Sequence, residues 1–187
     1  MPLISSLVRN FVISRLLDAD PTTKGFNYWA AQLAGSVDYP NIDPFQLVTD
    51  TNFFTGAITE GVLESTAIDS VYPLVIVYSN GLRPRSATDA ITPSEFSGVV
   101  PVTIDFYSGF DRTEMPMDSE DILDLAEDAI FETFTRYDTA CLWANGQGFS
   151  FNNQISSNRG DLVPGGQNWR QLNRFVIQVQ IGDAQPR

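Results

Sequence analysis

The segment from Asp118 to Thr135, DSEDILDLAEDAIFETFT, decides the fold because it carries the clearest helical pattern in the chain. Its apolar side recurs at helical spacing and occupies less than half of the helical wheel. This side comprises Ile122, Leu123, Ala126, Ala129, Ile130, Thr133 and Phe134. The opposite arc comprises Glu120, Asp121, Asp124, Glu127, Asp128 and Glu132, with Phe131 among these acids. The pattern predicts an amphipathic helix whose apolar side is buried against the rest of the fold.

Helical and strand patterns flank this segment on both sides. Apolar spacing predicts one helix over Leu3–Leu17 and a weaker one over Thr23–Leu33. Continuous or alternating apolar residues predict strands over Tyr72–Ser79, Val99–Tyr107 and Arg174–Ile181. These elements indicate an α+β fold with a mixed or antiparallel sheet and helices mainly on one face.

Alternation within Val99–Tyr107 assigns its side chains to two faces of the sheet. We expect Val102, Ile104 and Phe106 to face the core, and Thr103, Asp105 and Tyr107 to face out.

Two long stretches, at about 36–70 and 137–170, have no sustained periodicity. We expect both to be loop insertions in a single domain spanning residues 1–187. Short strands are expected within them at segments such as Phe53–Phe54, Ala140–Trp143 and Phe149–Asn153.

Composition narrows the classes of function. The net charge of −12, from 23 acids and 11 bases, argues against a surface that grips DNA or an anionic membrane. The single cysteine, Cys141, excludes an internal disulfide and favours folding in the cytosol. Arg9 and Arg15 interrupt the apolar start of the chain, so we expect neither a signal peptide nor a membrane anchor.

The chain lacks the residues of most common catalytic and metal sites. It has no histidine, which excludes Ser-His-Asp and Cys-His machinery and most zinc sites. The stretch that begins at Asp50 resembles a calcium loop, but Phe54 holds a ligand position and Gly61 replaces the bidentate glutamate. A hydrolase built on two distant carboxylates stays open, because such pairs leave no local motif. We predict no catalytic, cofactor-binding or metal-binding residues, no cofactor and no enzymatic activity.

The order and texture of five segments resemble the tail-terminator, or tail-completion, family of long-tailed bacteriophages of the lambda type. The segments are the N-terminal helix Leu3–Leu17, the Tyr-Pro-led strand with its following glycine (Tyr72–Gly81), the alternating strand Val99–Tyr107, the acidic helix Asp118–Thr135 and the closing strand Arg174–Ile181. They cover 60 residues, and the two insertions exceed what compact members of the family carry.

This resemblance implies a structural virion protein of the phage neck. Members of the family form a ring, expected to be a hexamer, that caps the tail tube and joins it to the head. The implied partners are other copies of the chain, the tail tube protein and a head-completion or connector protein, while DNA passes through the ring without specific binding. The implied location is the virion tail or neck, after assembly in the host cytoplasm. The alternatives are another head–tail connector or tube-adjacent virion protein, and a carboxylate-based hydrolase or acidic binding module.

In a ring, the acidic arc of the central helix is the candidate site. Asp124, Asp128 and Glu132 follow one another at one-turn spacing and repel each other. They could line the lumen, where negative charge would repel passing DNA, or form a solvated outer face. Phe131 favours a third hypothesis, a contact with another subunit or partner. The sequence leaves all three open.

Overall fold

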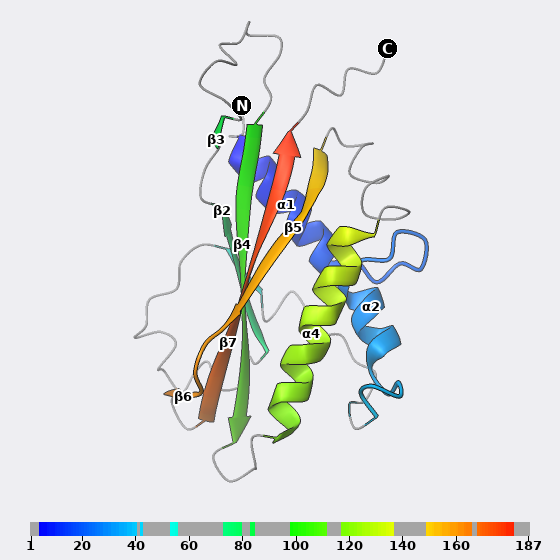
Figure 1. Ribbon diagram of the computed structural model, residues 1–187, viewed down its shortest axis with the longest axis vertical. Coiled ribbons are helices and arrows are strands. Elements are labelled where there is room, and N and C mark those ends of the chain that lie inside the picture. The colour runs from blue at the N-terminus through cyan, green and yellow to red at the C-terminus, as the bar shows by residue number, and fades with distance from the viewer. Residues whose placement is uncertain are drawn as a thin grey trace, which may run out of the picture.

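The residues that the structure describes form one seven-stranded sheet with helices packed against it (Figure 1). The computed structural model describes residues 4–40, 42, 53–55, 73–79, 83–84, 98–111, 117–136, 149–165 and 168–181. The helices are α1 (Ile4–Leu17), α2 (Phe26–Leu33) and α4 (Met117–Thr135). The strands are β1 (Phe53–Thr55), β2 (Leu74–Ser79), β3 (Arg83–Pro84), β4 (Gly98–Asp111), β5 (Phe149–Arg159), β6 (Val163–Gly165) and β7 (Asn168–Ile181).

The sheet is built around the pairing of β4 with β7. The strand order is β1-β2-β4-β7-β5, with β3 beside β4 and β6 beside β7. The strands β2, β4, β7 and β5 pair antiparallel, and only the short β1 runs parallel to its neighbour β2. The predicted α+β class with a mixed or antiparallel sheet is confirmed.

The helices share one hydrophobic core with a single face of the sheet. Phe151 of β5 shows this, because its ring stacks on Phe11 of α1 at a centroid distance of 5.4 Å and meets Phe134 of α4 edge-on at 4.9 Å. The core side chains of β4 (Val102, Ile104 and Phe106) point to the same side and are buried. The prediction that the helices lie on one face is therefore confirmed.

The apolar side of α4 is buried as expected, and the buried surface is wider than the sequence pattern indicates. Six of the seven residues assigned to this side are buried, and Ile122 is partly buried. Leu125, which lies outside the predicted arc, is also buried, with 1% of its surface exposed. Because α4 packs against α2 as well as the sheet, a second flank of the helix is covered.

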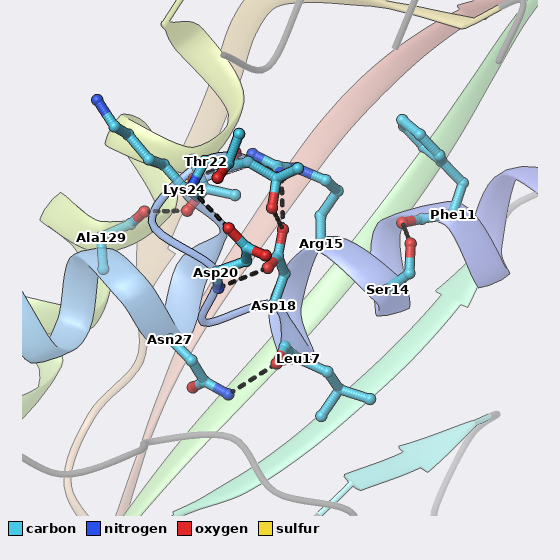
Figure 2. A network of polar contacts seen from close by, with 12 residues as sticks. Phe11, Ser14, Arg15, Leu17, Asp18, Asp20, Thr22, Lys24, Asn27 and Ala129 are labelled. Carbon is cyan, nitrogen blue, oxygen red and sulfur yellow. Dashed lines mark hydrogen bonds and ion pairs between the residues drawn. The ribbon is translucent and has the colours of Figure 1, made fainter. Parts of the chain in front are cut away.

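A buried arginine organises the turn between α1 and α2 (Figure 2). Arg15 is fully buried and donates hydrogen bonds to the carbonyl oxygens of Thr23 (2.8 Å) and Lys24 (3.0 Å) and to the Asp18 carboxylate (3.0 Å). The Thr23 hydroxyl donates to the same Asp18 oxygen at 2.5 Å. These bonds close the turn that follows α1 and set the start of α2.

The turn also requires a glycine at position 25. A Cβ atom there would lie 2.5 Å from the Arg15 carbonyl oxygen and 2.6 Å from that of Asp18, closer than real contacts allow. Since the φ of Gly25 is −78°, the requirement is steric and does not come from an unusual backbone conformation.

Several predictions need correction on the C-terminal side. Much of the stretch at about 137–170 was expected to be loop, yet β5 continues to Arg159, β6 follows it, and β7 begins at Asn168. Strand pairing with β7 and β4 supplies backbone hydrogen bonds that need no apolar alternation. Most of 36–70 and the expected strand Ala140–Trp143 lie outside the described residues.

The second face of β4 was expected to be exposed to solvent, but the structure shows that it is largely covered. Thr103 and Asp105 are buried, with 2% and 4% of their surface exposed, and Tyr107 is half-buried. Alternation identified the face correctly but gave no information about whether that face is covered.

Candidate functional site

The predicted site residues on α4 are split between the two flanks of the helix. Asp124 and Asp128 are exposed, and Phe131 and Glu132 are half-buried. Asp124 lies toward β5, while Asp128 and Glu132 contact groups on the α2 side. The structure therefore does not bring the three acids together as one unpaired row.

On the β5 flank, α4 meets a polar cluster at the edge of the sheet. Arg159 of β5 forms ion pairs with Asp124 and, at 3.6 Å, with Glu127. Glu127 also accepts hydrogen bonds from the Ser157 hydroxyl (2.8 Å) and the Asn173 amide (3.1 Å). Antiparallel register places these partners together, because Asn173 of β7 pairs with Arg159 of β5.

On the α2 flank, two acids of α4 are paired with aromatic and basic side chains. The hydroxyl of the buried Tyr39 donates a 2.6 Å hydrogen bond to Asp128. Glu132 forms an ion pair with Arg136, whose guanidinium lies 4.5 Å from the centroid of the Trp29 ring. Burial, reinforced by the hydrogen bond to Asp128, raises the pKa of Tyr39, so its hydroxyl remains a donor at neutral pH.

These contacts change the electrostatic interpretation of the acidic arc. Repulsion between acids one turn apart amounts to roughly 0.2–0.5 kcal/mol per pair in isolated helices. Here each acid of the candidate site has a cationic or hydrogen-bonding partner within the same chain, and the paired groups offset that repulsion.

A second polar group lies on the sheet face away from the helices, and no local sequence pattern identifies it. The Arg174 guanidinium donates two hydrogen bonds, of 2.6 and 2.8 Å, to the buried Asp105 carboxylate. The Tyr78 hydroxyl lies 3.4 Å from the same carboxylate. The three residues come from β7, β4 and β2, and the direct pairing of Asp105 with Arg174 sets the geometry.

Charges and burial perturb the proton affinities in this group. Hydrogen bonding to Asp105 raises the pKa of Arg174. Burial is the main cause of the raised pKa of both Tyr78 and Tyr107, followed by the negative charge of Asp105. At neutral pH both phenols are therefore neutral donors next to a fixed ion pair.

Arg170 lies on the same sheet face and has a different environment. It is buried, with 6% of its surface exposed, and its Nη1 atom has no hydrogen-bond partner. In the strand register Arg170 pairs with Gly109 of β4 and Val163 of β6, and neither residue has a side-chain hydrogen-bond acceptor. No local signal in the sequence distinguishes this arginine, because its burial depends on strand pairing.

Metal-binding groups and membrane-spanning helices are absent from the described part of the chain. Among the described residues, no three side chains of His, Cys, Asp or Glu form a group suited to a metal ion. Within the same ranges, no helix has the length and apolar content needed to cross a membrane. No family model matches the chain, and no curated protein matches it in sequence.

Proposed function

We propose that the protein is a structural component of a bacteriophage neck, a tail terminator that forms a ring, caps the tail tube and joins it to the head. In this role it needs no catalytic residue and no cofactor. Its partners would be further copies of the chain, the tail tube protein and a head-completion or connector protein. DNA would pass through the ring without specific binding.

The observation that carries the proposal is the packing of the segments on which the family resemblance rests. Although spread along the chain, they form one unit in which β2, β4 and β7 are adjacent strands and α1 and α4 pack on one face of them. Figure 1 shows these elements together along the length of the sheet. The segments that carry the resemblance therefore belong to one folded unit, which supports the proposal.

The pairing of acidic groups also favours a structural role over a carboxylate-based hydrolase. A hydrolase of that class needs two carboxyl groups that face each other across a substrate. Asp105 is held by Arg174, and Glu127 is bound by Ser157 and Asn173. These carboxylates have partners that fix them in place within the protomer.

The acidic arc of α4 would then contact a neighbour or line the lumen. The half-buried Phe131 favours the contact, because an aromatic side chain among charged residues is better accommodated when a second surface covers it. Asp124 and Asp128 remain exposed, and Asp128, whose partner is the neutral Tyr39 hydroxyl, would give the rim of that contact, or the lumen, negative charge.

Native mass spectrometry and sedimentation velocity of the purified protein test the proposal. We expect a closed oligomer, six copies by the family resemblance, either alone or after addition of tail tubes. In the contact hypothesis, Phe131→Ser should prevent the oligomer while the monomer keeps its circular dichroism spectrum and melting temperature. A wild-type protein that stays monomeric at high concentration and does not bind tube ends would contradict the proposal.

A further inference from the structure

Arg170 is a buried arginine for which the part of the chain that the structure describes supplies no ion-pair partner. It lies on β7 four residues from Arg174, so both side chains are on the sheet face opposite the helices. Arg174 is already held by the Asp105 carboxylate, and 45% of its side chain is exposed. Arg170, by contrast, is 6% exposed, and no hydrogen bond satisfies its Nη1 atom.

Tyr107 lies between the two arginines in the register. It pairs with Leu172, while Asp105 pairs with Arg174 on one side and Gly109 with Arg170 on the other. Both arginines are close enough for their charges to act on the Tyr107 phenol, although burial and Asp105 act in the opposite direction. The phenol therefore adds a neutral O–H donor to the same sheet face, two positions along β4 from the residue that pairs with Arg170.

The charges of this group do not balance. Among the described residues, this face holds the Arg174–Asp105 ion pair, and no carboxylate lies within ion-pair distance of Arg170, which leaves the positive charge of Arg170 unpaired. Leaving a buried charge without a partner costs several kcal/mol, whereas an Arg–carboxylate pair forms strong, short hydrogen bonds. The unbalanced charge matches one monoanionic group.

We propose that Arg170 and Tyr107, with Arg174 at the rim, form a binding site for a single carboxylate group. Because only 6% of Arg170 is exposed, the proposed ligand group is the carboxylate of one side chain or one small molecule and not the backbone of a DNA duplex. The single excess charge fits a carboxylate better than a phosphate dianion. The carboxylate can come from an Asp or Glu side chain of a second copy of this acidic chain, or from a small carboxylate in solution. The site does not require that the chain forms a ring.

The first test compares sodium acetate, sodium phosphate and sodium chloride at equal ionic strength, with thermal unfolding as the measurement. For a free carboxylate, acetate should raise the melting temperature of the wild-type protein by about 5 °C near saturation, and phosphate should do less. Arg170→Gln should abolish the acetate effect without lowering stability in chloride, because it removes an unpartnered buried charge. Arg136→Gln is the matched control: it removes an arginine that pairs with Glu132 on α4, and it should keep the acetate response.

The second test identifies a carboxylate supplied by another copy. In that case wild-type protein should self-associate in sedimentation velocity, acetate should weaken the association, and Arg170→Gln should weaken it about tenfold or more. If Arg170→Gln does not fold, Tyr107→Phe keeps the ring and removes only the hydroxyl donor. It should weaken acetate binding or self-association several-fold.

Three results would overturn the proposal. One is a wild-type protein with neither an acetate effect nor an association that depends on Arg170. Another is phosphate stabilising the protein as strongly as acetate through Arg170, which would make the site a general oxyanion site. The third is a Tyr107→Phe protein that folds and binds as the wild type does in both tests.

Discussion

Tyr39 donates a 2.6 Å hydrogen bond to the carboxylate of Asp128, a residue 89 positions further along the chain. The bond fixes the segment after α2 to the outer side of α4. It also means that an acid expected to belong to a repulsive row takes part in the protomer's own packing.

Replacing Tyr39 by phenylalanine should lower the free energy of unfolding by about 1–2 kcal/mol, because a buried hydroxyl that binds a charged acceptor is lost. Urea unfolding would measure the change. Tyr28→Phe on α2 is the control, because the half-buried Tyr28 has a ring contact with Trp29 and no hydroxyl bond to any described residue. Equal midpoints for the two variants would show that the Tyr39–Asp128 bond contributes nothing to stability.

The turn between α1 and α2 provides a steric prediction. Gly25→Ala should destabilise the protein by more than about 2 kcal/mol, because its Cβ would meet the carbonyl oxygens of Arg15 and Asp18 at 2.5 and 2.6 Å. Gly160→Ala is a matched control, since its nearest contact would be an ordinary 3.7 Å to the Leu172 carbonyl oxygen. Thermal melts of both should differ clearly. A Gly25→Ala protein as stable as Gly160→Ala would mean that the turn is placed differently.

Neutralising the acidic arc tests whether repulsion or pairing dominates on α4. From like-charge spacing alone, replacing Asp124, Asp128 and Glu132 by asparagine or glutamine would preserve or improve stability. The pairs with Arg159, Tyr39 and Arg136 reverse that expectation. Exposed pairs contribute about 0.2–1 kcal/mol each, so we expect a net loss of about 1 kcal/mol that shrinks at high salt. A more stable triple variant would show that repulsion dominates.

Alkaline pH should weaken the fold through its tyrosines. The pKa values of Tyr39, Tyr78 and Tyr107 are raised above the ordinary value of 10.0, mainly by burial. Above about pH 10 the unfolded chain therefore loses phenol protons that the folded chain retains. Stability from these groups is fully present below pH 10 and falls as the pH rises through the folded pKa values. Urea midpoints from pH 8 to 11 should fall, and less steeply in Tyr78→Phe; a flat profile would contradict the assignment.

Local sequence patterns predicted the helices and strands well, but they predicted poorly which faces of these elements are covered by other parts of the fold. The helix and its buried side at Leu123 and Ile130 follow from spacing within one segment. The burial of Leu125 does not, because it depends on where α2 packs. The strand β7 was expected to begin at Arg174. Its first part, Asn168–Asn173, lacks clear alternation and is extended because it pairs with β4.

The polar groups were the least predictable part of the candidate sites. Asp105 and Arg174 are 69 residues apart, and only the strand register makes them partners. Glu127 and Asn173 are 46 residues apart and become partners because α4 packs on the sheet. The acids of α4 were identified from sequence, but their partners come from β5, from the α2 side and from the end of the helix itself.

Electron microscopy of the purified protein mixed with phage tail tubes tests the central claim most directly. The proposed function predicts rings, six-fold by the family resemblance, seated at one end of each tube, with tubes that no longer elongate once capped. Tubes with bare ends that continue to grow in a saturating excess of the folded protein would contradict it.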